Sequence, residues 1–408
     1  METRYFRTVW AENRDGSSPD GKLRLRVNDT EVSLDPLFGH RWEAGENGLM
    51  LVEVTDDLFS LTAVELYLEL WGGHPGTAGK RFTINGRGFY ELPEVGAASG
   101  ACVYSHPSIG LEVRNLVRGT NAFQFTCERG SSDWGHFIVD NACLRLYLED
   151  SHPSLSEAAL PQRPPRVAAE LRKAGEGVRI ALHPQDAEML KDTLLGVDYF
   201  GFYEGFDDTG AGTGLGWHGF SQDRRWRNHV GTAASVPYAV EWDTSMVADQ
   251  EAPVSLRALL HFHGGLHRWS EVLHDVRLPA RAPLVSLHQV ARPPRPFWSR
   301  AGRVVSAVLP LNVDPDTIER AELWVRTWDG GAGDIREPFT LNGNPYRVIS
   351  GKAIHDVVFT RSLVDTGHLR RGGNELNLVS DTDRHGIEIL APGPCLVVRS
   401  RGPKSRFS

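Results

Sequence analysis

The chain of 408 residues is long enough for about two to four domains, and its hydrophobic fraction of 40% is sufficient for ordinary protein cores. Its formal net charge of −8 argues against nucleic acid as the main partner, because phosphate binding requires a clustered positive surface. No apolar run is long enough to span a bilayer, so we expect no membrane span. Residues 1–5 (METRY) do not begin a signal peptide, which leaves a cytoplasmic protein or an exported one whose signal has been removed.

The four cysteines, at positions 102, 127, 143 and 395, are few for a chain of this length. Such a chain usually keeps its thiols free and buried, so we predict no structural disulfides, with a Cys102–Cys127 bridge as the alternative. Cys143 and Cys395 each begin a closing strand and are each followed by leucine. These matched positions indicate packing and not a bond between the two.

Residues 1–150 are predicted to form a first β-sandwich module. Within residues 64–71 (VELYLELW), leucines alternate with other residues, so one face of the strand is apolar and Tyr67 and Glu69 lie on the other. Turn signals separate the strands, among them Asn85-Gly86, which suits a tight hairpin because both residues tolerate positive φ. No helical pattern of useful length appears, and this combination is typical of an antiparallel sandwich or jelly roll.

A proline-rich linker, 151–166, is expected to act as a semi-rigid spacer before a middle module at 167–278. The middle module also consists of short alternating strands. Its segments 231–233 (GTA) and 237–244 (PYAVEWDT) resemble those of Ig-like β-sandwich modules found in bacterial polysaccharide-active proteins. A long loop rich in glycine, aspartate and tryptophan spans 204–228.

The last module, 297–401, follows a second proline-rich linker, 278–296, and is an internal repeat of the first. Three segments match in the same order: 64–71 with 321–328, 82–86 (FTING) with 339–343 (FTLNG), and 116–121 with 369–374. On the Phe-x-Ile/Leu-Asn-Gly and Leu-x-x-Gly-x-Asn segments, both outer modules resemble galactose-binding-domain-like jelly rolls. That resemblance implies a fold that hosts carbohydrate-binding modules, accessory domains of glycoside hydrolases and lyases, and structural spacers, so it does not by itself give a function.

The middle loop holds the first candidate site. Glu204, Asp207 and Asp208 lie beside a glycine-rich turn, and a Ca²⁺ ion requires about six to eight oxygen ligands of the kind that carboxylates and carbonyls supply. A calcium site is one hypothesis. The other is a turn that only caps the sandwich, since the spacing of an EF-hand is absent.

Farther along the same loop, Trp217 offers an indole face for a sugar ring, and His218 offers a hydrogen-bonding group for a hydroxyl. We therefore treat both as candidate ligand-binding residues. The alternative is that Trp217 packs the loop onto the sandwich.

The last connection of each outer module combines acidic residues, a histidine and a glycine. Loops at the ends of sandwiches are common binding positions, so these residues are predicted ligand contacts, with a solvent-exposed polar turn as the alternative. They are Asp133, Trp134 and His136 in the first module, and Asp383, Arg384 and His385 in the last. Because the second copy lacks the tryptophan, the sequence predicts that at most one copy has kept a given ligand site.

A group of histidines, at 261, 263 and 267, resembles a metal site, because residues two apart in a strand share a face. A polar strand face is the preferred interpretation, since no cysteine or carboxylate lies close in sequence.

Recognisable catalytic motifs are missing: the chain has no nucleophile elbow, zinc-protease motif or Walker loop. Paired carboxylates for glycoside hydrolysis need not be close in sequence, so Asp207, Asp208 and Asp243 with His218 remain candidates.

These patterns predict an all-β protein of three sandwiches: a jelly roll, an Ig-like sandwich and a second jelly roll. The preferred hypothesis is a non-catalytic protein that binds a glycan or polysaccharide, or recognises a surface, with two related modules adding avidity. One alternative is a polysaccharide-active hydrolase or lyase that uses the middle loop. The other is a structural protein whose sandwiches assemble into oligomers.

Overall fold

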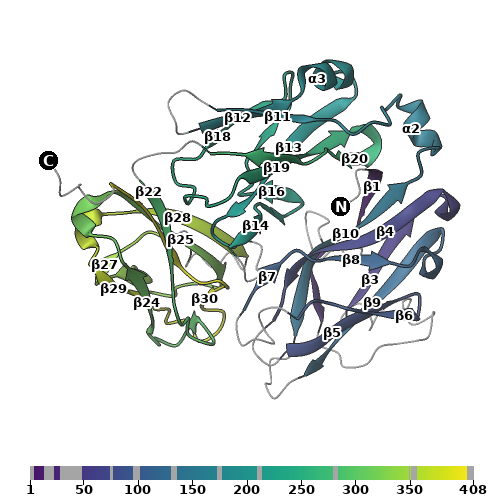
Figure 1. Ribbon diagram of the computed structural model, residues 1–408. Helices are drawn as coiled ribbons and strands as arrows, with labels where there is room; N and C mark the ends of the chain where they lie inside the picture. Colours follow the sequence, from purple (N-terminus) through teal and green to yellow (C-terminus); the bar gives the residue numbers. More distant parts are fainter. Residues whose placement is uncertain are drawn as a thin grey trace.

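The computed structural model of the chain describes residues 4–12, 23–27, 48–73, 77–94, 102–129, 136–171, 177–208, 214–278, 284–348, 350 and 356–401. Its strands form antiparallel sheets that pair into sandwich-like units, so the predicted all-β fold is confirmed (Figure 1). None of the helices in these ranges is long and apolar enough to cross a membrane. All four cysteines are free and buried, as predicted.

Helical structure in the described ranges is limited to short segments. They are α2 (Pro153–Glu157), α3 (Pro184–Leu190) and the 3-10 turns η2 (Leu58–Ser60), η4 (Val113–Asn115), η5 (His263–Gly265), η6 (Pro315–Thr317) and η7 (Thr366–His368).

The first sandwich packs two antiparallel sheets face to face. The alternation expected from the sequence places Leu66 and Leu68 in a core that they share with Phe82 and Phe125. One sheet contains β2 (Leu25–Val27), β4 (Leu61–Trp71), β7 (Tyr104–Ser105), β8 (Ser108–Leu111) and β10 (Phe137–Leu148), and the other contains β3 (Leu49–Val54), β5 (Thr77–Ile84), β6 (Arg87–Glu91) and β9 (Gly119–Arg129).

The middle sandwich is built in the same way, and an extra hairpin projects from its long loop. One sheet contains β13 (Leu194–Glu204), β14 (Leu215–Trp217), β17 (Gly231–Ala233), β19 (Val254–Phe262), β20 (Leu266–Trp269) and β21 (Leu273–Val276), and the other contains β11 (Val167–Leu171), β12 (Gly177–Leu182) and β18 (Ala239–Asp243). The hairpin consists of β15 (Phe220–Gln222) and β16 (Arg225–Arg227).

The N-terminal strand β1 (Tyr5–Trp10) joins the first and middle sandwiches. On one edge Phe6 pairs with Tyr147 of β10, and on the other it pairs with His267 of β20. The result is one sheet of 12 strands that runs through both sandwiches, with a shared hydrophobic core. The sequence did not predict this continuity, because strand pairing between modules leaves no local pattern.

The last sandwich has its own core and lies beside the other two (Figure 1). One sheet contains β22 (Leu284–Gln289), β23 (Trp298–Ser299), β25 (Ile318–Asp329), β28 (Val357–Val364), β30 (Ile387–Ile389) and β31 (Cys395–Ser400), and the other contains β24 (Val305–Leu311), β26 (Phe339–Leu341), β27 (Asn344–Pro345) and β29 (Gly372–Leu378).

The repeated Asn-Gly segments form equivalent turns in the two outer sandwiches. Asn85 and Asn342 have φ values of 54° and 52°, as a tight hairpin of this type requires. The Asn85 amide donates to Oδ1 of Asn121 at 3.0 Å, and the Asn342 amide donates to Oδ1 of Asn374 at 2.8 Å. Asn121 and Asn374 are fully buried, so these hydrogen bonds anchor each turn to the interior of its sandwich.

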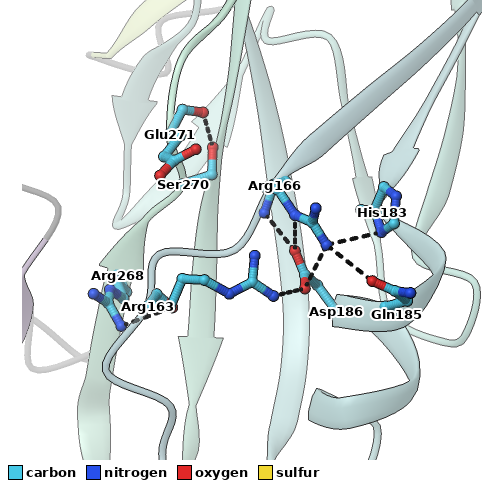
Figure 2. A network of polar contacts seen from close by, with 8 residues as sticks. All are labelled: Arg163, Arg166, His183, Gln185, Asp186, Arg268, Ser270 and Glu271. Atoms are coloured by element: carbon cyan, nitrogen blue, oxygen red, sulfur yellow. Dashed lines mark hydrogen bonds and ion pairs between the residues drawn. The ribbon is translucent and has the colours of Figure 1, made fainter.

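The linker between the first and middle sandwiches is bound firmly to the middle one (Figure 2). Arg163 and Arg166 both bond the buried carboxylate of Asp186 in α3. Arg268 donates to the backbone oxygen atoms of Pro161 and Gln162. The predicted semi-rigid spacer is therefore held by charge-assisted hydrogen bonds as well as by its prolines.

Candidate functional site

A cleft of about 630 Å³ lies where the two repeated sandwiches meet, and we call it the inter-repeat cleft. Each copy of the repeat supplies one wall, from equivalent positions at the ends of matched strands. Strand β4 ends at Trp71 opposite Ile138, and strand β25 reaches Trp328 opposite Glu388. The lining residues are Arg24, Arg26, Trp71, His136, Ile138, Trp298, Ser299, Arg300, Trp328, Asp383, Arg384, His385, Gly386 and Glu388.

Each copy of the repeat contributes one tryptophan–histidine pair. The rings of Trp71 and His136 have centroids 5.3 Å apart. The rings of Trp328 and His385 lie 5.8 Å apart and nearly perpendicular, at 87°. Trp298 of β23 adds a third indole, and the Arg300 guanidinium lies 4.9 Å from its ring centroid. The cleft is therefore a composite of both copies.

Burial differs between the floor and the rim of the inter-repeat cleft. Trp71 and His136 are buried, whereas Trp298 and Trp328 are half-buried, so their rings are partly available to a ligand. The turn that carries Asp383, Arg384 and His385 is exposed at the rim.

The charged groups of the cleft are mainly positive. Four arginines face two carboxylates, and arginine stays protonated at any physiological pH. Arg24 is paired with Asp140 at 2.6 Å, and Arg26 donates to Nδ1 of His136 at 3.5 Å. The charged residues that line the cleft are therefore mainly positive, although the whole chain has a net charge of −8.

Glu388 is the buried acid of the cleft, at 8% exposure. Burial raises the pKa of its carboxyl group to about 7, although Arg300 and a hydrogen bond with Cys102 both act to lower it. Near neutral pH this group exchanges a proton readily, which is a property of general acids and of pH-dependent binding sites.

Apolar contacts beneath the cleft hold the two outer sandwiches together. Trp71, Cys102 and Tyr104 of the first form one buried cluster with Val357 and Leu390 of the last. A backbone hydrogen bond of 2.8 Å also joins residue 391 to residue 102. The two halves of the cleft are thus held in a fixed relation.

The predicted site residues do not all come together. His136, Asp383, Arg384 and His385 line the inter-repeat cleft. Asp133 and Trp134 lie outside the described residues. Trp217 and His218 belong to the middle sandwich and line neither side of this cleft.

The side chains of Asp208, Trp217 and His218 in the middle loop contact other residues of the middle sandwich. Asp208 is fully buried, accepts a hydrogen bond from Asn228, and lies 3.7 Å from the imidazole of His218. The His218 ring donates to the backbone oxygen of Tyr203 at 2.8 Å. Trp217 is half-buried, with the Arg257 guanidinium 4.0 Å from its ring centroid. These contacts favour the interpretation that the loop packs onto the sandwich.

The calcium hypothesis for Glu204, Asp207 and Asp208 remains a prediction. Within the ranges that the structure describes, no group of three or more His, Cys, Asp or Glu side chains is arranged to hold a metal. Residues 209–213 of the same loop lie outside those ranges.

Sequence reasoning missed Trp71, Trp298 and the arginines of the cleft other than Arg384. The signal for the first was present, because the repeat alignment places Trp71 over Trp328 at the end of matched strands. Trp298 and these other arginines come from segments without a counterpart motif, and only the folded chain brings them together.

Comparisons with known proteins do not assign a family. No family model and no curated protein matches the chain. Among solved structures, a β-porphyranase of glycoside hydrolase family 86 from Bacteroides plebeius is similar over 60% of this chain and 38% of its own, with 14% identity and a TM-score of 0.25. The glycoside hydrolase domain of Endo-D from Streptococcus pneumoniae covers 62% of this chain and 36% of its own, with 11% identity and a TM-score of 0.25.

A further family 86 enzyme, crystallised with neoagarooctaose, matches 58% of this chain with 10% identity and a TM-score of 0.24. The chain thus spans only 34% to 38% of the length of these three proteins. The function proposed below rests on the residues of the inter-repeat cleft.

Proposed function

We propose that the protein binds an oligosaccharide in the inter-repeat cleft. The observation that carries this proposal is the meeting of Trp71, Trp298 and Trp328 in one cleft that also contains histidines and arginines. An indole ring packs well against the apolar face of a pyranose, and a few polar groups around it fix the orientation of the hydroxyls.

The charge of the cleft favours an acidic sugar. A guanidinium can bond two oxygen atoms of one carboxylate or sulfate at once, and arginine is suited to such planar recognition. Arg300 and Arg384 are placed in the cleft near the half-buried tryptophans, and the acidic groups there are fewer than the arginines. A uronate or sulfated oligosaccharide therefore fits better than a neutral one.

Substitution of the half-buried tryptophans tests the proposal. Trp328→Ala and Trp298→Ala should each weaken binding by about 1–2 kcal/mol, or roughly five- to thirty-fold in Kd, because each removes a stacking surface. Isothermal titration calorimetry against oligogalacturonates and chondroitin sulfate oligosaccharides measures the effect.

Trp217→Ala is the matched control, since Trp217 is also half-buried but lies in the middle sandwich. It should leave the affinity unchanged. If Trp217→Ala abolished binding and the two cleft variants did not, the site would belong to the middle loop.

A second candidate function, hydrolysis of a glycosidic bond, is favoured by one observation. Glu388 has a pKa of about 7 and shares the cleft with Asp383, and glycoside hydrolysis uses a pair of carboxyl groups of which one is protonated. Chromatography of the same oligosaccharides after incubation would reveal cleavage products. Loss of cleavage with retained binding in Glu388→Gln would establish an enzyme, and absence of products in the wild type would leave a binding protein.

A further inference from the structure

A second cleft, of about 440 Å³, lies on the 12-stranded sheet where β1 joins the first and middle sandwiches. Its floor includes Phe6 and Trp10 of β1 and His267 of β20. Its wall is the hairpin β15–β16, so we call it the hairpin cleft. None of the residues predicted from the sequence as ligand contacts lines it.

The hairpin has a fixed position, because hydrogen bonds anchor it to the first sandwich. The buried carboxylate of Glu69 in β4 accepts hydrogen bonds from Ser221 Oγ and from the backbone amides of Asp223 and Arg224, at 3.0 and 3.1 Å for the amides. Gln222 donates to the backbone oxygen of Val357 in the last sandwich at 2.7 Å. All three sandwiches therefore fix its position.

Aromatic rings are available in the hairpin cleft. Trp226 is half-buried and packs edge-on against Phe200, with centroids 4.8 Å apart. Trp10 is half-buried as well, with the Arg224 guanidinium 5.1 Å from its ring centroid. These half-covered indoles offer the same kind of surface to a sugar ring as those of the inter-repeat cleft.

The charge of the hairpin cleft is positive at its rim. Arg225 and Arg227 are exposed on either side of Trp226, and neither has a carboxylate partner among the residues that the structure describes. Deeper in the cleft, the Arg145 guanidinium lies 4.3 Å from the ring centroid of Tyr67. An anionic group that entered would therefore meet the unpaired guanidinium groups of the rim.

Asp198 is the carboxylate in the lining, and both of its oxygens already accept hydrogen bonds. His261 Nε2 donates to it at 2.6 Å, and Thr232 donates to its other oxygen. Nδ1 of His261 in turn lies 2.9 Å from Nδ1 of His267. Burial lowers the pKa of His267 to about 3, so its ring is neutral and can accept a hydrogen bond from a sugar hydroxyl.

We propose that the hairpin cleft is a second binding site, which takes an acidic sugar residue. Trp226 and Trp10 supply the stacking surface, and Arg225 and Arg227 pair with the carboxylate or sulfate of the ligand. The sugar class rests on the function proposed for the inter-repeat cleft, whereas the anionic group rests on the arginines of this cleft alone. One chain then holds two oligosaccharides, or two parts of one long polysaccharide.

The stoichiometry of binding tests the proposal with the whole chain. A galacturonate trisaccharide and a sulfated chondroitin fragment of similar length serve as separate probes, so that carboxylate and sulfate ligands are distinguished. The wild type should bind two molecules of the recognised probe in calorimetry. The double variant Arg225→Gln/Arg227→Gln should bind one, and so should Trp298→Ala/Trp328→Ala, because each pair disables one cleft. A neutral xylotriose should not compete.

Arg336→Gln/Arg371→Gln is the matched control, since both arginines are exposed and line neither cleft. It should still bind two molecules. A wild-type stoichiometry of one that only the tryptophan variant abolishes would overturn the second site and leave the proposed function intact. A single site that only the Arg225/Arg227 variant abolishes would overturn the inter-repeat cleft instead. Equal binding of xylotriose would overturn the acidic class.

Discussion

Replacement of Arg326 by methionine is expected to lower the free energy of unfolding by about 3–5 kcal/mol, the range for removal of one partner from a buried ionic cluster. Arg326 is fully buried where the three sandwiches meet. Its guanidinium donates to the backbone oxygen of Asp208 in the middle sandwich and, at 3.2 Å, to that of Tyr104 in the first. The variant leaves both oxygens without this donor and removes a cation that interacts with the buried carboxylate of Asp208.

Urea denaturation followed by tryptophan fluorescence measures this change. Arg326→Lys should fall between the wild type and Arg326→Met, because an ammonium keeps the charge but lacks the planar fork that reaches two carbonyls. Arg320→Met is the matched control on the same strand. Arg320 is half exposed and pairs with Glu322 at 2.6 Å, so its loss should cost less than about 1 kcal/mol. Equal stability of Arg326→Met and the control would show that the junction does not depend on Arg326.

The contacts of Arg326 also explain what the sequence could not predict. The repeat in residues 64–71 and 321–328 identified two related modules and placed Trp71 over Trp328. It contained no information on how the modules face each other, since that arrangement depends on residues from three separate segments. For this reason the sequence predicted that at most one copy has kept a given ligand site, whereas the structure brings His136 of the first copy and His385 of the second into a single cleft.

Strand β4 shows the same limit at the level of single side chains. The alternation correctly placed Leu66 and Leu68 in the core and Tyr67 and Glu69 on the opposite face. That opposite face is nevertheless buried, because the hairpin β15–β16 covers it and bonds Glu69. A polar face that packs against another module has the same sequence pattern as a face exposed to water.

What the sequence predicted well was local. The Asn-Gly turns, the alternating strands and the free thiols follow from residue type and spacing alone. The hairpin cleft required β1 to pair with two sandwiches at once, and the inter-repeat cleft required the two copies to approach each other. Both clefts are properties of module packing, and so their arginines and tryptophans are scattered along the chain.

Between pH 4.5 and 7, the free energy of unfolding of the wild type is expected to fall by about 3 kcal/mol relative to that of Glu388→Gln. A pKa difference of one between the folded and unfolded states corresponds to about 1.4 kcal/mol. The pKa of Glu388 rises from its ordinary value of 4.5 to about 7 in the folded chain, because burial disfavours the charged form. In this window the folded state binds more protons than the unfolded state, so stability falls as pH rises.

Urea denaturation of both proteins at several pH values measures the difference between their free energies of unfolding. His136, His385 and the cleft arginines are present in both proteins, so their contributions to this difference cancel. Glu322→Gln is the matched control, since Glu322 is a buried glutamate of the same sandwich outside the inter-repeat cleft, and it should retain the pH dependence due to Glu388. If the unfolding free energies of the wild type and Glu388→Gln changed with pH in parallel, the pKa assigned to Glu388 would be contradicted.

The titration of Glu388 should also change the affinity for the ligand. A charged Glu388 repels an acidic sugar, so affinity at the inter-repeat cleft should fall above pH 7 in the wild type and stay level in Glu388→Gln.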